Sequence, residues 1–564
     1  MADHLAPGHP GIPPRWTSSA KSGVGTAAAG DGQVWFTISH GIVNEVYFPR
    51  LDQANTRDCG LLVTDGTGFF SEEKRHAVCQ IQPVAQGVPG YQLINTCTRG
   101  RYRVSKLILT DPHRDVLLQR VRFEALQGRL ADYRLYVLLA PHIGDCGAGN
   151  SGWVGQYKGL TMLVAERDGT ALALACSTPF KGLSCGYVGV SDGWQDIRAH
   201  GRMTWFSPSA PNGNIALTGE IDLASSGRMF VLALGFGRNA AEAGHQARAA
   251  LLEDFDRSAR DYVDGWQAFQ SRCVDLDHVG ESGFDLYRVS TAVLKTHQAK
   301  HLPGGMIASL SIPWGFEKGD EDLGGYHLVW PRDLVESAGG LLAAGDAADA
   351  RRALLYLMST QDVGGSWPQN MWLDGTPYWS GVQMDETAFP ILLAGLLRRA
   401  QALDGLDAWP MVRAAADFLL QNGPVTQQDR WEEDGGYSPF TLMPSTSSCY
   451  GRCATGACST RRRNPSSAIA GIGFAPRSPS GASITNVGSW LADKPCGSKC
   501  WRPPTSIGVW TAGTRCRILR RRIVGWAYTI STCPLRSSLP GRPSCSPSSG
   551  RWPIGGKDRT LPSR

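Results

Sequence analysis

Short apolar runs separated by Gly, Asp, Asn and Pro occupy the chain from Gly32 to Gly237. Runs such as QVWFTISHG, YRVSKLILTD and RMFVLALGFG are rich in β-branched and aromatic residues, and apolar and polar positions alternate within them. A period of two is typical of half-buried strands, and many such strands at regular spacing indicate a large antiparallel sandwich. We therefore expect residues 1–239 to form an N-terminal β-sandwich domain.

The hydrophobic period changes at Ala240 from two to that of an α-helix. The stretch 240–272 is predicted to be a linker helix that leads out of the sandwich. Helices connected alternately by tight turns and by long aromatic loops indicate stacked hairpins whose loops gather at one end, where function usually resides. The helical runs that follow the linker are DLYRVSTAVLKTHQ, DLVESAGGLLAAG, AADARRALLYLMSTQ, ETAFPILLAGLLRRAQAL and WPMVRAAADFLLQNG.

The last 122 residues differ in composition from everything before them. Residues 443–564 hold 19 Lys and Arg against 2 Asp and Glu, whereas residues 1–442 hold 37 against 48. The segment is rich in Arg, Ser, Pro, Gly and Cys and shows no long helical period. A GC-rich gene translated in a shifted frame gives this composition. We therefore predict a frameshift after Leu442, natural or introduced by sequencing, and an aberrant, disordered tail.

Two other interpretations of the tail are a zinc site and a nucleic-acid surface. CYGRC and CGSKC pair cysteines, and the net charge of the tail is strongly positive. However, the cysteine spacing matches no standard zinc pattern, and the basic residues occur without a recognisable helix or aromatic sheet. We therefore expect neither a metal nor a nucleic-acid partner. The seven cysteines before residue 443 are scattered, which predicts reduced core thiols.

The N-terminal stretch MADHLAPGHPGIPPRW lacks the apolar core of a signal peptide, and no later run approaches the roughly 20 apolar residues that span a bilayer. The expectation is a soluble, cytoplasmic protein with no membrane partner. GVGTAAAG, at residues 23–30, has the glycine content of a phosphate-binding loop. It lacks the preceding strand and following helix of such a loop, so no nucleotide cofactor is expected.

Three loops share one composition, in which Trp and Tyr are mixed with carboxylates and Arg. Aromatic faces cover the apolar faces of sugar rings, while carboxylate and guanidinium groups bind hydroxyls through charge-assisted hydrogen bonds. The expected ligand is therefore a carbohydrate. The loops YHLVWPRD, WLDGTPYWSGVQMDE and RWEEDGGYS contribute Tyr326, Trp330, Arg332, Asp333, Trp372, Asp374, Tyr378, Trp379, Gln383, Asp385, Trp431, Glu432, Glu433 and Tyr437.

Cleavage of a glycosidic bond needs a carboxylic acid to protonate the departing oxygen and a second carboxylate on the opposite face. Packing of Glu432 against Trp431, with Glu433 adjacent, would raise the pKa of Glu432 through lost hydration and like-charge repulsion. Adjacent glutamates also occur as ordinary solvated clusters at helix ends. Composition alone leaves both interpretations open.

The motifs YHLVWPRD, PYWSGVQMDE and RWEEDGGYSPFT, in this order and at these separations, resemble the bacterial glucoamylases and glucodextranases of glycoside hydrolase family fifteen. The resemblance covers residues from about Ser19 to Leu442. It implies an N-terminal super-β-sandwich, a linker helix and an (α/α)6 barrel, of which residues 273–442 would be the first half. The implied activity is the exo-acting, inverting release of glucose from the non-reducing ends of α-glucans, without cofactor or metal.

The same resemblance implies roles for individual residues. Glu432 would be the general acid, and Arg332 and Asp333 would hold the terminal glucose by its outer hydroxyls. Loop packing for Trp330 and Trp379, and a structural ion pair for Arg332 and Asp333, remain alternatives. The implied substrate-binding residues are Tyr326, Trp330, Arg332, Asp333, Trp379, Trp431 and Glu433.

The catalytic base of the family is a second Glu much further along the chain, in a PEQ-like segment. Here no Glu follows Glu433. The hydrolase is therefore expected to be inactive as written, and the alternative is a non-catalytic carbohydrate-binding protein or a decayed remnant. The sequence does not choose among α-1,4-glucans, α-1,6-glucans and trehalose as substrates.

Overall fold

A computed structural model describes residues 5–277, 283, 285–312, 318–321, 325–430, 435–439 and 441. The tail 443–564 lies outside these ranges, and so do Trp431, Glu432 and Glu433. The expectations for the tail and for the general acid therefore stay predictions.

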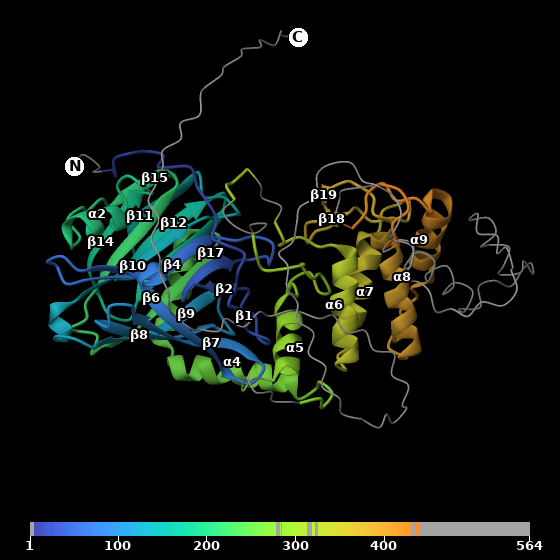
Figure 1. Ribbon diagram of the computed structural model, residues 1–564, viewed down its shortest axis with the longest axis horizontal. Coiled ribbons are helices and arrows are strands. Elements are labelled where there is room, and N and C mark those ends of the chain that lie inside the picture. Colours follow the sequence, from blue (N-terminus) through green and yellow to red (C-terminus); the bar gives the residue numbers. More distant parts are fainter. Residues whose placement is uncertain are drawn as a thin grey trace, which may run out of the picture. The chain divides into compact units, whose positions relative to one another are not determined.

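Two antiparallel sheets form the N-terminal half, which confirms the predicted β-sandwich (Figure 1). One sheet has the order β1-β2-β3-β4-β10-β16-β14, with β5 paired to β4, and the other has the order β15-β11-β12-β13-β17-β9-β8-β7-β6. The strands are β1 (Gly23–Thr26), β2 (Trp35–Ser39), β3 (Ile42–Tyr47), β4 (Thr56–Thr64), β5 (Phe70–Glu72), β6 (Ala77–Ala85), β7 (Val88–Cys97), β8 (Tyr102–Thr110), β9 (Val116–Ala125), β10 (Arg134–Pro141), β11 (Asn150–Tyr157), β12 (Leu160–Arg167), β13 (Thr170–Cys176), β14 (Phe180–Tyr187), β15 (Ser209–Gly213), β16 (Ile215–Ile221) and β17 (Met229–Gly237).

Alternate residues of these strands face the space between the sheets, as the period of two requires. Leu61 and Val63 of β4 point into this inter-sheet core, together with Leu172 and Leu174 of β13, and all four are buried. Trp35 of β2 faces the other way and joins a second apolar cluster, which also contains residues of the helices. The sandwich therefore has a core of its own and a second apolar surface on which the helical region packs.

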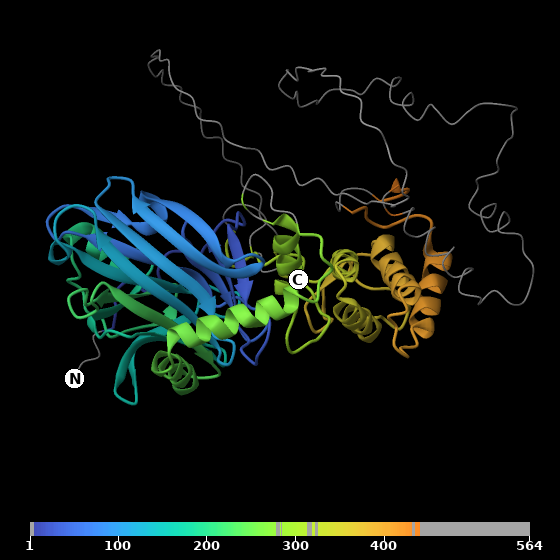
Figure 2. The ribbon, with the colours of Figure 1, turned by 90° about the horizontal axis from the view of Figure 1, so that it is seen from below.

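The region expected to form one linker helix forms two, α3 (Ala240–Leu252) and α4 (Phe255–Gln270). The break occurs because Glu253 is extended and the Asp254 side chain accepts a hydrogen bond from the amide of Asp256, which caps a new helix. The helix α3 packs on β17 and β13, and α4 runs beneath the ends of β7 and β8 (Figure 2). The shorter helices of the sandwich are α1 (Glu73–His76), α2 (Gly193–His200) and the 3-10 turn η1 (Leu130–Asp132).

The helical region contains the stacked hairpins expected from the sequence (Figure 1). The helix α6 pairs with α7, α8 pairs with α9, and α6 packs directly against α8. Within the described residues these helices make up only part of a barrel. The elements are α5 (Leu286–Thr296), α6 (Pro331–Ala343), α7 (Ala347–Thr360), β18 (Asn370–Met371), β19 (Pro377–Trp379), α8 (Met384–Arg399) and α9 (Trp409–Asn422).

Two further expectations concern the described residues. None of the helices in these ranges is long and apolar enough to cross a membrane. The seven described cysteines are all unpaired, and five of them are buried, as expected of reduced core thiols.

Candidate active site

The N-termini of two neighbouring helices bring charged residues together. Arg332 is the second residue of α6, after Pro331, which suits the first position of a helix. Asp385 and Glu386 lie in the first turn of α8. Carboxylates are stabilised at helix N-termini, where backbone N–H groups have no partner within the helix. Because α6 packs against α8, these residues of two separate sequence motifs meet at one end of the bundle.

Arg332 is the centre of this charge cluster. Its Nη1 lies 2.6 Å from Oε1 of Glu386 and 3.1 Å from Oδ2 of Asp385. The same nitrogen donates to Oε1 of Gln383 at 3.0 Å, and the backbone N–H of Arg332 donates to Oε2 of Glu386 at 2.6 Å. Arg332 is only 7% exposed. A buried guanidinium needs such partners, since an unpaired buried charge is strongly destabilising.

Asp333 differs from the other carboxylates of the cluster in its access to solvent. Its side chain is 42% exposed, whereas those of Asp385 and Glu386 are fully buried. Its Oδ2 lies 3.4 Å from Nη2 of Arg332. Partial burial raises the pKa of Asp333, and the nearby Arg332 opposes that rise. Complete burial holds the pKa of Glu386 well above its ordinary value.

The structural ion pair left open by the sequence is present, and it involves Arg332 far more than Asp333. Arg332 forms the structural ion pairs, mainly with α8. Asp333 keeps an accessible carboxylate beside the guanidinium. The sequence motif predicted the pair, and Asp385 entered only through the composition of its loop. Glu386 was missed, although a carboxylate pair at the start of a helical run was a usable signal.

Four aromatic rings of two predicted loops contact one another in a row. Trp379 contacts Tyr378 at a centroid distance of 5.4 Å, and Tyr378 contacts Trp372 at 5.8 Å. Trp372 in turn meets the ring of His327 at 5.5 Å. Trp379 is half-buried.

The hairpin β18–β19 connects the two aromatic loops. Val329 and Met371 exchange both of their backbone hydrogen bonds, at 2.9 and 3.0 Å. On the other side of β18, the amide of Trp379 donates to Oδ1 of Asn370 at 2.9 Å. Trp330, which follows Val329, is 6% exposed and leads directly into α6, and Tyr326 is 36% exposed. The structure thus links the segment carrying Arg332 to the segment carrying Trp379.

Residues of the sandwich fix this hairpin from the other side. The buried carboxylate of Asp52 accepts a hydrogen bond from the amide of Leu373 at 2.9 Å. Arg50 pairs with Asp52 at 2.6 Å and with Asp374 at 2.9 Å. The contacts with Leu373 and Asp374 join residues more than 300 positions apart, so no local pattern could have predicted them.

A second sandwich contact reaches the loop before α6. Asp145 lies 3.7 Å from Nε2 of His327, whose side chain is fully buried. The carboxylate of Asp145 also accepts a hydrogen bond from the amide of Ala54 at 2.7 Å. Burial raises the pKa of Asp145, and His327 opposes that rise. The sandwich therefore contacts the loops of the candidate site at two points, with a hydrogen bond and ion pairs at the hairpin and with this longer contact at His327.

The described residues before the WEED segment contact α8, and Gly436 after it is bonded to one of them. Thr426 and Gly436 exchange backbone hydrogen bonds at 3.0 and 2.9 Å. The hydroxyl of Thr426 accepts a hydrogen bond from the amide of Met384 at 3.3 Å. Arg430, immediately before Trp431, lies 3.4 Å from Asp385. Sequence reasoning gave no role to Arg430, which adds a second cation to the carboxylates of α8.

Among the described residues, no group of three His, Cys, Asp or Glu side chains is placed to hold a metal ion. The described residues of the candidate site are charged and aromatic. A buried guanidinium, an accessible carboxylate and half-buried indole and phenol rings are suited to binding hydroxyls and ring faces of a sugar.

Two sequence families match the chain one after the other. "Glucodextranase, domain N" matches residues 6–271, and "Glycosyl hydrolases family 15" matches residues 284–365 and 362–449. The first therefore covers the sandwich with α3 and α4, and the second covers the helices and all three aromatic loops.

Two similar proteins match the chain across both of these regions. A glucoamylase of Clostridium sp. (strain G0005) is 41% identical over 433 residues, which are 77% of this chain and 60% of that protein. The crystal structure of a bacterial glucoamylase complexed with acarbose is similar with a TM-score of 0.75 at 38% identity, over 81% of this chain and 67% of that one. The chain thus spans less than two thirds of the length of the Clostridium relative. It belongs to the bacterial glucoamylase- and glucodextranase-like proteins of glycoside hydrolase family 15, with their N-terminal domain and part of their family 15 domain.

Proposed function

We propose that the chain derives from an exo-acting, inverting glucoside hydrolase that releases glucose from the non-reducing ends of α-1,4-glucans. The observation that carries the proposal is the accessible carboxylate of Asp333 beside the buried guanidinium of Arg332. The family membership and a similar bacterial glucoamylase crystallised with acarbose support it.

In this proposal the charge cluster binds the terminal glucose before any bond is broken. Asp333 accepts hydrogen bonds from outer hydroxyls, and Arg332, held in place by Asp385 and Glu386, donates one. Trp379 and Tyr326 cover ring faces. Because Arg332 is already fixed by α8, little side-chain freedom is lost when the sugar binds.

Glu432 is the proposed general acid, which protonates the glycosidic oxygen as the bond breaks. It lies two residues after Arg430, whose guanidinium lies beside Asp385. Inversion also requires a base that activates water on the opposite face of the ring. No Glu follows Glu433. We therefore propose that this chain binds glucans but lacks the roughly 10²–10⁴-fold rate acceleration that a general base contributes to hydrolysis.

The second candidate function is therefore a non-catalytic carbohydrate-binding protein, or a decayed remnant of the enzyme. The lack of a later Glu favours it over full activity. Within the family, α-1,6-glucans and trehalose are the alternative substrates. A panel of maltotriose, isomaltotriose and trehalose separates these three linkages.

Calorimetric titration of the chain with maltotriose tests the binding part of the proposal. We expect saturable binding that Asp333→Asn weakens by about 10-fold or more, since a hydrogen bond to a charged group contributes roughly 1.5–3 kcal/mol. The control Glu124→Gln removes an exposed carboxylate of β9 in the sandwich and should leave the affinity unchanged. Equal affinities for all three proteins would refute the proposed site.

Proton NMR of the same mixtures tests turnover, because the first glucose released reveals its anomer. Slow or absent release of glucose by a chain that still binds maltotriose would support the proposed loss of the catalytic base. Rapid release of β-glucose by the written chain would contradict the lost base and establish the full enzyme. Sequencing the gene around codon 442 adds an independent test, since a one-base correction that restores a Glu-containing helical continuation would establish the frameshift.

A further inference from the structure

A polar groove lies on the sandwich, on the face of the eight-stranded sheet that is turned away from the inter-sheet core. It encloses about 450 Å³, within the range of ligand-binding clefts. The N-terminal segment, α1 and the start of α2 form its walls, and strands β4, β10 and β16 form its floor. No residue of the hydrolytic site contributes to it. The charged and aromatic lining residues are Arg15, Arg57, Asp58, Glu72, Lys74, Arg75, His142, Asp192 and Trp194.

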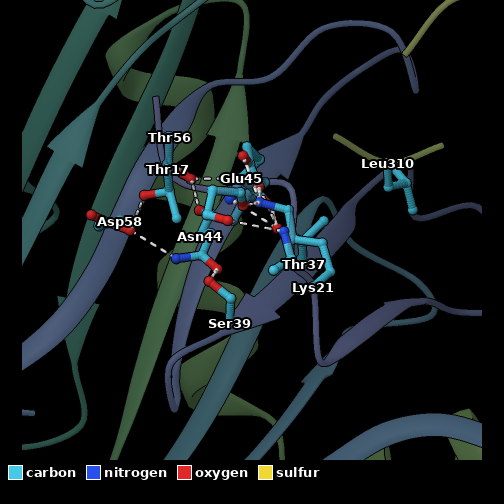
Figure 3. A network of polar contacts seen from close by, with 12 residues as sticks. Thr17, Lys21, Thr37, Ser39, Asn44, Glu45, Thr56, Asp58 and Leu310 are labelled. Carbon is cyan, nitrogen blue, oxygen red and sulfur yellow. Dashed lines mark hydrogen bonds and ion pairs between the residues drawn. The ribbon is translucent and has the colours of Figure 1, made fainter. Parts of the chain in front are cut away.

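The floor of the groove is held rigidly by the network around Asp58 (Figure 3). Oδ1 of Asp58 accepts hydrogen bonds from the hydroxyl of Thr17 at 2.9 Å and from the amide of Asn44 at 2.8 Å. Oδ2 of Asp58 pairs with Lys74 at 2.8 Å. On the far side of Asn44, its side-chain oxygen accepts a hydrogen bond from Ser39 at 2.5 Å. The charged groups of the floor are therefore positioned before any ligand arrives.

Two buried nitrogen atoms of lining residues lie just beneath the surface of the groove without a hydrogen-bond partner in the described part of the chain. Nε of Arg57 and Nδ1 of His142 are buried and have no hydrogen-bond partner among the described residues. Burial lowers the pKa of His142 to about 3, so this ring is neutral at neutral pH. Buried polar atoms of this kind are usually satisfied, by protein, by water or by a ligand.

An acceptor and an aromatic ring complete the wall. Oε2 of Glu72 accepts the indole N–H of Trp194 at 2.9 Å and lies 3.4 Å from Nη1 of Arg75. Both contacts fall on the same oxygen, so Oε1 of Glu72 remains an acceptor. The half-buried ring of Trp194 is fixed edge-on against Phe70 at a centroid distance of 5.6 Å. The groove thus offers donors, an acceptor and an indole close together.

The mixture of charges decides the class of ligand. Four cations and three carboxylates line the groove, so a strongly charged anion would meet repulsion as well as attraction. A neutral polyol suits such a lining, because each of its hydroxyls both donates and accepts hydrogen bonds. We propose that this groove is a second carbohydrate site, which holds a stretch of α-glucan chain away from the hydrolytic site. The identity of the glucan rests on the proposed function, whereas the groove itself does not.

Hydrogen exchange of the whole chain with and without maltoheptaose tests this proposal. We expect protection of amides in two separate groups of peptides, 72–75 with 188–196 for the groove and 326–336 with 369–386 for the hydrolytic site. Trp194→Ala should weaken the apparent affinity at the groove peptides by roughly five- to tenfold, as expected for loss of one aromatic contact. Protection at the hydrolytic peptides should stay unchanged.

Two further variants guard against a folding artefact. Arg75→Ala removes a guanidinium that is 63% exposed, so the fold is not at risk, and it should weaken protection at the groove by a smaller factor. Trp205→Ala removes another partly exposed tryptophan of the sandwich, outside the groove, and should change neither group of peptides.

The outcomes separate the two proposals. Protection confined to the hydrolytic peptides would overturn the groove proposal and leave the proposed function standing. Protection confined to the groove would support the groove proposal and refute the proposed hydrolytic site. Protection at neither group would overturn both. Protection of the groove by inorganic phosphate but not by maltoheptaose would replace the carbohydrate with an anion and also overturn the proposal.

Discussion

The sandwich and the helical region bury charged residues in different ways. In the sandwich, Asp58 lies in a network whose members, Thr17, Asn44 and Lys74, all belong to the same domain. In the helical region, the loops that carry the candidate site contact the buried sandwich residues Asp52 and Asp145. The sandwich is self-contained, whereas the site is not. The N-terminal domain therefore acts as a structural support of the loops that carry the candidate site.

Limited proteolysis should show the largest difference between the two regions. The inter-sheet core is built entirely from sandwich residues, so we expect a resistant N-terminal fragment that ends at or beyond Gln270, the end of α4. The helical region should be degraded earlier, because its described helices share an apolar cluster with the sandwich and have no separate cluster of their own. Mass spectrometry identifies the fragments. A resistant fragment that includes α9 would contradict this ranking.

Removal of the central guanidinium should destabilise the helical region strongly. Arg332→Met leaves Asp385 and Glu386 buried without their main counter-charge, which costs about 3–5 kcal/mol when a buried pair loses one partner. Denaturant unfolding followed by fluorescence measures the change. The matched variant Arg413→Met removes a 67% exposed arginine of α9 and should cost less than about 1 kcal/mol. Similar losses for the two variants would mean that the cluster is not buried as described.

Arg50 of the sandwich pairs with both Asp52 and Asp374, so the contact between the two regions can be weakened by replacing either carboxylate. Asp52→Ala leaves the buried amide of Leu373 without its acceptor and should cost about 1–3 kcal/mol. Asp374→Ala removes the 46% exposed partner of the same Arg50 and should cost less than about 1 kcal/mol. Asp52→Ala should also weaken maltotriose binding, since β18 and β19 lose their support. Unchanged binding in Asp52→Ala would separate the sandwich from the site.

The smallest expected effect is on the pH dependence of stability. Burial raises the pKa of Asp333, so the folded chain holds this proton at a higher pH than the unfolded chain does. The resulting stabilisation is present below the ordinary Asp pKa of about 4 and is lost as the pH rises through the folded pKa. Asp333→Asn should therefore lose less stability than the wild type between pH 4 and pH 7.

Unfolding curves at several pH values measure this difference. The control Glu124→Gln should follow the wild type, since this exposed carboxylate lies in the sandwich, away from the cluster. A steeper loss of stability in Asp333→Asn than in the wild type would reverse the sign of the assigned pKa shift.

Local patterns of the sequence predicted the helices and strands better than the contacts between them. Alternation of apolar residues was sufficient for the strands, because each face of a strand meets one environment. The single linker helix was wrong because its period continues across Glu253, and only the capping side chain of Asp254 reveals the break. The composition of three loops predicted a sugar site, and that site stays a prediction. It did not reveal that Arg332 is bound mainly to α8, because that contact requires the packing of two helices.

The contacts from Arg50, Asp52 and Asp145 had no local signal at all. Each joins positions that are distant in the sequence, and each looks like an ordinary loop residue until the fold is formed. Side chains that support a site from another domain are therefore the class that sequence reasoning misses.

A crystal structure of the chain soaked with acarbose tests the central claim most directly. The account predicts a terminal ring within hydrogen-bonding distance of Asp333 and Arg332, with Trp379 against a ring face and with Asp52 still bound to the amide of Leu373. A terminal ring bound elsewhere, or no ligand at this position at saturating concentration, would contradict it.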